Sequence, residues 1–234
     1  MVNINFFKDL LQVLKDLISM EELALEDCTG SPTSGHVLEG VSRRLMCIVT
    51  AFELLSGQGS TFMISTEQVL KEKKFAGEAL NIDLGDFVSK LFAMLLPLSL
   101  ACEIDNQSST AVINMLFRAL NIIFSPKTSG ARASPCRSAA YAKRLLSVSL
   151  HWPPSAALRT LEFVGNLITK DPKLEAMLST EDRIFDGIYR ADVDDPELCH
   201  PFESSFWELH TLHQNHWDPK VRQEAMRLLG FKSL

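Results

Sequence analysis

The sequence consists largely of amphipathic segments of helical period, each ended by turn residues, and this pattern favours a fold of helices packed on helices. The stretch HWDPKVRQEAMRLLG, residues 216–230, shows the pattern most fully. Asp218 can cap the free amides of a first turn, and Pro219 occupies the first helical position, where its missing N–H costs nothing. Three apolar positions then recur on one face, and Gly230 stands where a left-handed residue would close the helix.

The same period recurs along most of the chain, so we predict an all-α protein. Strand signals are weak, with two Tyr residues and few alternating runs of Val, Ile or Thr. The expected helices cover residues 2–18, 36–57, 83–103, 108–124, 136–152, 155–170, 171–178, 205–216 and 219–229. The third of these is expected to kink or break at Pro97.

Connections between these segments are short, which favours antiparallel neighbours, and several helix pairs in series favour an α-solenoid. The order Asp-Pro-x-Val-Arg-x-x-Ala at residues 218–225 is typical of the second helix of a HEAT-like repeat. No exact repeat period is present. We therefore predict stacked antiparallel helix pairs in a degenerate HEAT/armadillo-like α-solenoid.

The net charge of −6 is unevenly distributed, because no acidic residue occurs between Asp105 and Glu162 while seven basic residues do. Five of the seven lie in or beside a loop rich in Ser, Gly and Pro or on the helix after it: Lys127, Arg132, Arg137, Lys143 and Arg144. Such a patch can contact phosphates, so we predict an RNA-facing surface here. The alternative is a solubilising loop beside a helix rim. No aromatic-stacking RNA motif supports sequence-specific readout.

Signals for catalysis and for metal binding are weak. The chain lacks a G-x-S-x-G elbow and a phosphate-binding loop, and Asp194-Asp195 is interpreted as a solvated turn. Cys199, His200, His210, His213 and His216 are the candidates for a zinc site, but packing and solvent-facing histidines are the preferred interpretation. We expect no enzyme activity, no metal and no cofactor.

Five Cys residues without CxxC spacing predict reduced thiols in an intracellular protein. The most apolar run, residues 92–102, is too short to span a bilayer, so we expect no membrane contact. Phe202, Phe206 and Trp207 are the aromatic residues that we predict as partner contacts. The alternative is that Phe206 and Trp207 belong to the core.

Five blocks carry a family resemblance: CIVTAFELLSGQG (47–59), EALNIDLGDFVSKLF (78–92), MLFRALN (115–121), AYAKRLLSVSLHWPP (140–154) and FWELHTLHQNHWDPKVRQEA (206–225). Together they resemble the nucleolar complex-associated protein 3 family, in its CCAAT-binding-factor-type (CBF/Mak21-like) domain. The resemblance covers most of residues 37–230, with the blocks in family order.

This resemblance implies a non-enzymatic scaffold of the nucleus and nucleolus. Family members pair with a nucleolar complex protein 2 family member on large ribosomal subunit precursors, which contain pre-rRNA and proteins. The implied roles are precursor assembly, rRNA processing and intranuclear transport, together with chromatin binding beside replication factors in DNA replication initiation. The alternatives are a HEAT-like nuclear transport adaptor or another helical protein-interaction module.

Two departures from the family pattern affect the domain assignment. The family chain is longer, so residues 1–234 are interpreted as its C-terminal CBF-type helical domain. In the family the first two blocks are contiguous, whereas here the 18 residues 60–77 separate them. We interpret this insertion as a retained in-frame intron or a lineage-specific loop, and we expect residues 58–79 to pack poorly.

Overall fold

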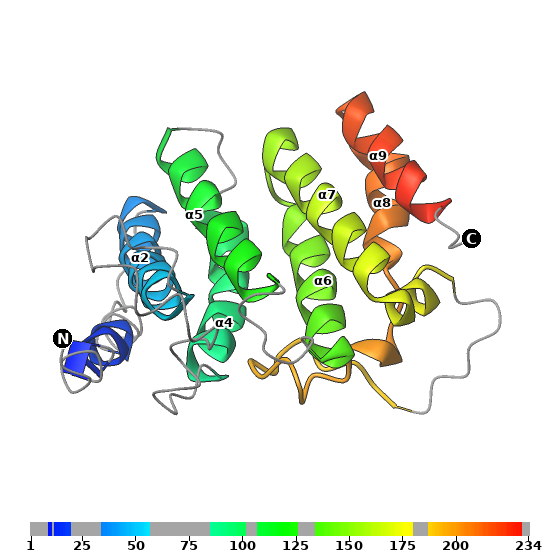
Figure 1. The fold of residues 1–234 in the computed structure, drawn as a ribbon. Helices are drawn as coiled ribbons and strands as arrows, with labels where there is room; N and C mark the ends of the chain where they lie inside the picture. Colours follow the sequence, from blue (N-terminus) through cyan, green and yellow to red (C-terminus); the bar gives the residue numbers. More distant parts are fainter. Residues whose placement is uncertain are drawn as a thin grey trace, which may run out of the picture. The chain divides into compact units, whose positions relative to one another are not determined.

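The computed structural model describes residues 9–10, 12–19, 34–56, 85–101, 107–125, 134–179 and 187–230, and every regular element within them is helical. The elements, shown in Figure 1, are α2 (Ser34–Ser56), α4 (Gly85–Ala101), α5 (Gln107–Ile123), α6 (Pro135–Ser149), α7 (Pro154–Lys170), η2 (Pro172–Met177), η3 (Pro201–Glu203), α8 (Trp207–Asn215) and α9 (Pro219–Leu229). This confirms the all-α prediction for the described part of the chain. The expected insertion at residues 58–79 lies outside the described residues.

The chain divides into two compact units, Met1–Leu91 with Ala111–Arg132, and Phe92–Thr110 with Ala133–Leu234. In the first unit, the helical residues 12–19 are joined to the start of α4 by an ion pair of 2.7 Å between Lys15 Nζ and Asp86 Oδ2. Apolar side chains spaced at helical intervals fill its interior, among them Ile18, Leu45, Ile48, Leu116 and Leu120.

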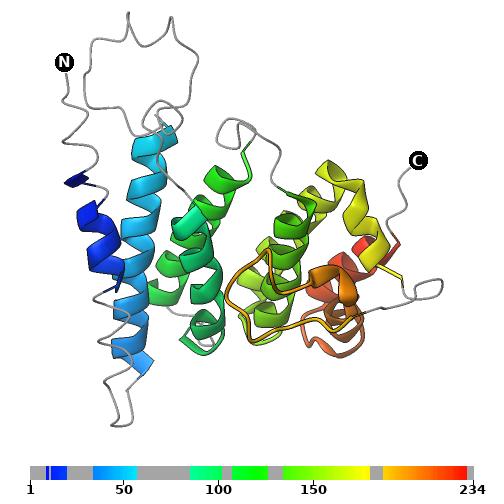
Figure 2. The ribbon, with the colours of Figure 1, turned by 90° about the horizontal axis from the view of Figure 1, so that it is seen from below.

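The second unit contains the helix pairs that were predicted in the last part of the sequence. Helix α6 packs on α7, α7 packs on α9, and α8 and α9 form a hairpin across the short turn at residues 216–218 (Figures 1 and 2). Helices α7 and α9 approach closely at Gly165, where an added Cβ would lie 3.0 Å from Leu228 Cδ2. Paired packing is thus confirmed, and the longer solenoid stack stays a prediction.

Helix starts follow the local signals in the sequence. Ser134 Oγ accepts a hydrogen bond of 3.1 Å from the Arg137 amide at the start of α6, and Pro135 takes the first helical position. At α9, Asp218 Oδ1 accepts from the amides of Lys220 at 2.7 Å and Val221 at 3.3 Å. These caps satisfy amides that have no partner within the helix.

The structure bears on three local predictions. Helix α4 continues through Pro97, so a break is excluded there, and the alternative of a kink stays a prediction. The short helix expected at residues 171–178 is present as a 3-10 helix, η2. The prediction for the end of α9 is wrong. Gly230 has φ −84° and ψ 2°, so α9 ends without a left-handed residue. Of the helices that the structure describes, none has the length and apolar character needed to cross a bilayer.

Candidate functional site

Helix α6 is buried on nearly every side, and two of its buried residues are cations. Lys143 and Arg144 are each 1% exposed. Both are covered by residues 187–206, which we call the connector: a segment of turns and irregular backbone that includes η3 and runs beside α6 (Figures 1 and 2). A buried cation requires a matched set of acceptors. The connector and the start of α8 supply most of them.

The Arg144 guanidinium binds the first half of the connector. Its Nη2 atom donates to the carbonyl oxygens of Ala191 at 2.8 Å and Val193 at 2.7 Å, and Nη1 donates to Asp194 Oδ1 at 2.9 Å. Nη1 also donates to Phe92 O at 3.2 Å, and the guanidinium carbon lies 3.7 Å from the centroid of the Phe92 ring. One side chain thus fixes three successive parts of an otherwise irregular backbone.

Lys143 binds the other end of the connector. Its Nζ atom donates to Ser205 O at 2.6 Å and to Glu208 Oε2 at 2.8 Å. The second carboxylate oxygen of Glu208, which is fully buried, accepts from Ser147 Oγ at 2.6 Å. Burial lowers the pKa of Lys143, and the charge of Glu208 opposes this shift. The pair closes the junction between connector and α8.

Aromatic rings surround the same ammonium group. Lys143 Nζ lies 5.1 Å from the centroid of the Trp207 ring and 5.7 Å from that of Tyr189. A cation over ring faces is stabilised by their quadrupoles. Burial raises the pKa of Tyr189 to about 12. Its phenol therefore stays neutral near pH 7.

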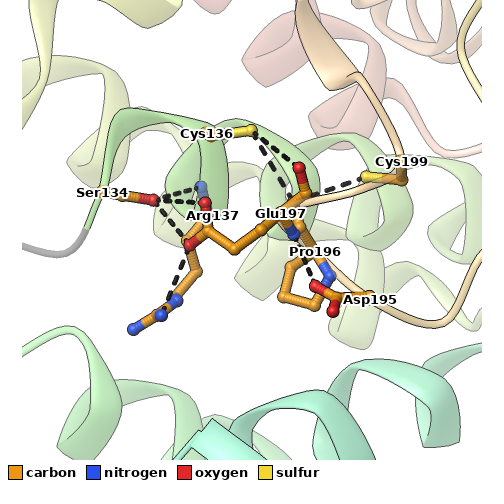
Figure 3. Close-up of polar contacts among 7 residues, drawn as sticks. All are labelled: Ser134, Cys136, Arg137, Asp195, Pro196, Glu197 and Cys199. Carbon is orange, nitrogen blue, oxygen red and sulfur yellow. Dashed lines mark hydrogen bonds and ion pairs between the residues drawn. The ribbon is translucent and has the colours of Figure 1, made fainter.

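The first turn of α6 holds the middle of the connector (Figure 3). Ser134 Oγ, which caps the helix, donates to Glu197 Oε1 at 2.7 Å. Arg137 Nη2 lies 3.3 Å from the same carboxylate oxygen. Within the connector, the Glu197 amide donates to Asp195 Oδ1 at 2.8 Å. Glu197 therefore connects Ser134, the cap of α6, to the connector turn at residues 196–198.

Two thiols complete this contact, as Figure 3 shows. Cys136 Sγ and Cys199 Sγ both donate to Pro196 O, at 3.8 Å and 3.6 Å. Burial raises the pKa of Cys199 to about 11. Burial, with the charges of Glu197 and Asp195, also raises the pKa of Cys136. Both thiols are thus protonated donors, and a thiolate nucleophile is disfavoured at this position.

The predicted basic patch is corrected by these contacts. Lys143 and Arg144 are buried and paired, so they do not belong to an exposed surface. The side chain of Arg137 is 32% exposed and is paired with Glu197. Lys127 and Arg132 lie outside the described residues. Three cations of the acid-free window pair with acidic residues that come later in the sequence: Lys143 with Glu208, Arg144 with Asp194 and Arg137 with Glu197.

The three predicted partner contacts differ in their exposure. Phe206 is 1% exposed, and its amide donates to Met177 O at 2.7 Å, so its side chain belongs to the core and cannot meet a partner. Trp207 is 49% exposed, so the alternative that it is a core residue is wrong. Phe202 is half-buried. Partner contact stays a prediction for Trp207 and Phe202.

The remaining candidates lie in separate places. His213 Nδ1 is 3.2 Å from Arg222 O, and His216 Nδ1 accepts from the Asp218 amide at 3.1 Å. In the parts of the chain that the structure describes, no three His, Cys, Asp or Glu side chains come together as metal ligands. Asp194 is exposed, as expected of a solvated turn, but its carboxylate also pairs with Arg144.

Glu208 was not among the residues predicted from the sequence, yet two features of the sequence indicate a buried ion pair. Glu208 stands four residues before Leu212, on the same helix face, and next to Leu209, and both of these neighbours are buried leucines. Between Ser138 and Ser149, α6 is apolar or small apart from Lys143, Arg144 and one further serine. A helix that is apolar on all sides is buried, and so are the charges on it.

Within the described residues, the fold is that of a helical protein in which the buried cations of α6 bind the irregular connector. The chain belongs to the CBF/Mak21 family, whose profile matches residues 44–225. It is 28% identical to nucleolar complex-associated protein 3 of Schizosaccharomyces pombe, over all of this chain and 30% of the relative. It is 30% identical to the nucleolar complex protein 3 homolog of Danio rerio, over 98% of this chain and 23% of the relative.

A second fungal protein gives the same result. Nucleolar complex-associated protein 3 of Saccharomyces cerevisiae is 28% identical, over all of this chain and 33% of the relative. The chain thus spans between about a quarter and a third of the length of these curated relatives. The predicted family is confirmed, and the names of the relatives agree with the predicted nucleolar and nuclear location.

Proposed function

We propose that this chain is the helical scaffold portion of a nucleolar assembly factor that acts in ribosome biogenesis without catalysing a reaction. The observation that carries the proposal is the family match over residues 44–225, together with relatives named as nucleolar complex proteins. The nucleus, and within it the nucleolus, is the proposed compartment. Maturation of large ribosomal subunit precursors, including rRNA processing and their movement through the nucleus, is the proposed process.

The contacts of α6 support a scaffold. Polar side chains that would otherwise serve a reaction or a ligand are hydrogen-bonded to the connector and α8, and they stiffen the second unit. Large apolar side chains remain outside, with Ile188 at 81%, Leu198 at 59% and Trp217 at 75% exposure. Exposed aromatic and aliphatic side chains of this size are typical anchors at protein interfaces.

The proposed partners are a nucleolar complex protein 2 family member and large-subunit precursors with their pre-rRNA and proteins. RNA contact through Lys127, Arg132 and Arg137 is retained in the proposal, and Lys143 and Arg144 are removed from it. Chromatin binding in replication initiation and the transport-adaptor alternative remain predictions, because no observation here favours either.

Affinity purification of the tagged protein from cells, with and without ribonuclease, tests the proposal. We expect the nucleolar complex protein 2 family member in both preparations and large-subunit pre-rRNA in the untreated one alone. A companion protein with Lys127→Ala, Arg132→Ala and Arg137→Ala should retain the protein partner and recover less pre-rRNA. Recovery of neither the partner nor pre-rRNA by the unaltered protein would overturn the proposal.

A further inference from the structure

A groove of about 530 Å³ lies between the turn that joins α6 to α7 and the turn that joins α8 to α9. Trp217 lines it and is 75% exposed, and Pro153 and Pro154 line it from the other turn. Its volume is within the range of sites that hold a small ligand or a short peptide. None of the residues that line it is Asp, Glu, Lys or Arg.

The exposed Trp217 ring packs on a neighbouring side chain whose own position is fixed by hydrogen bonds. Its ring stacks on that of His216, with centroids 5.9 Å apart and planes 16° apart. His216 is itself fixed, because its Nδ1 atom accepts from the Asp218 amide, and the carbonyl oxygens of His216 and Trp217 both accept from Arg222 Nη1. A preformed aromatic face loses little conformational entropy when a ligand binds.

Uncharged hydrogen-bonding groups line the groove around this ring. In the described part of the chain, the side chains of His151, Thr211 and Asn215 make no hydrogen bond to other residues, and neither does the indole N–H of Trp217. By contrast, the indole of Trp152, which also lines the groove, donates to Leu98 O at 3.0 Å. The groove therefore offers free donors beside an apolar, aromatic surface.

The charge of the lining selects among possible occupants. A nucleic acid would bring phosphates, whose binding depends on Lys and Arg, and the lining has neither. An acidic or basic peptide would likewise find no counter-charge there. A segment made largely of proline carries no side-chain charge and adopts the polyproline II conformation, whose carbonyls make no internal hydrogen bonds. Such segments dock in grooves lined by aromatic rings, where donors such as an indole N–H can bind the free carbonyls.

We propose that this groove binds an extended, uncharged, proline-rich segment of a partner protein, with Trp217 as its central contact. The inference rests on the proposed scaffold function and names the chemistry of one of its partners. Because the groove lies within the second unit, the rest of the chain need not move for the segment to bind.

The test uses the 15N-labelled 234-residue chain and decaproline as the probe. The chain has three Trp residues, 152, 207 and 217, so its spectrum contains three indole N–H signals. Trp207 does not line the groove, so its signal is the internal control. We expect decaproline to shift the Trp217 signal in a saturable way and to leave the Trp207 signal in place. Trp217→Ala should weaken binding of labelled decaproline at least about tenfold, as expected for a central aromatic anchor.

Met226→Ala is the matched control, because Met226 is 60% exposed on α9 and does not line the groove. This variant should bind decaproline like the unaltered chain. Absence of a shift with decaproline, or a Trp217 shift produced by decauridylate alone, would overturn the inference. If decaproline fails while cellular purification still recovers the nucleolar partner, only the groove inference falls. Loss of that recovery with decaproline binding intact refutes the proposed function instead.

Discussion

Replacing Arg144 by Met is the most informative perturbation of this structure, because the change removes the guanidinium and keeps most of the side-chain volume. Three carbonyl oxygens lose their donor, those of Phe92, Ala191 and Val193. Each buried acceptor that loses its donor costs about 1–3 kcal/mol, so we expect the three carbonyls together to cost about 3–5 kcal/mol. Arg144→Lys keeps the charge but cannot reach all the acceptors, so it should lose about 2 kcal/mol.

Urea unfolding followed by Trp fluorescence measures this loss, since all three Trp residues lie in the same compact unit as α6. Hydrogen exchange at the Arg190 amide, which donates to Cys199 O, reports whether the connector has come loose. Asp194→Asn is the control: its carboxylate is 60% exposed, so the change should cost less than about 1 kcal/mol. An equally small cost for Arg144→Met, with exchange unchanged, would refute the reasoning.

Three further predictions concern single residues. Asp218→Ala should lower the free energy of unfolding by about 1 kcal/mol, since it removes the cap of α9, and calorimetry that detects no loss contradicts the capping role. Gly230→Ala should be neutral or stabilise by up to about 1 kcal/mol, because φ is −84° and an added Cβ meets nothing closer than 3.6 Å; marked destabilisation would indicate a left-handed residue after all. Burial raises the pKa of Cys199 from 9.0 to about 11, so the thiol ionises first in the unfolded chain. The stability that the neutral thiol provides is therefore complete below pH 9 and is lost as the pH rises from 9 to 11. The unfolding free energy of Cys199→Ala should fall less over this range, and parallel pH curves for the two proteins would exclude the effect.

The start of a helix could be predicted from the sequence because the capping residue is adjacent in sequence to the helix that it begins. Asp218 is adjacent to Pro219, and the oxygen that caps α9 belongs to the residue just before the helix. The same holds at Asp171, whose carboxylate accepts from the Lys173 amide. Burial of a helix face was also predictable, since apolar residues recur at intervals fixed by the helix itself.

The site could not be read in the same way, because its partners lie far apart along the chain. Lys143 pairs with Glu208, 65 residues later, and Arg144 with Asp194, 50 residues later. An acid-free window of sequence says nothing about acids that the fold brings to it. The thiol contacts of Cys136 and Cys199 depend on the same connector and were equally hidden.

Selective acetylation of lysines tests most directly whether the cations of α6 are buried and bind the connector, rather than forming a surface that binds nucleic acid. The folded 234-residue chain is treated briefly with an N-hydroxysuccinimide ester of acetate, and the modified lysines are identified by mass spectrometry. Lys143, at 1% exposure, should remain unmodified while the exposed Lys220 reacts, and both should react after denaturation in urea. Equal labelling of the two lysines in the folded chain would contradict the account.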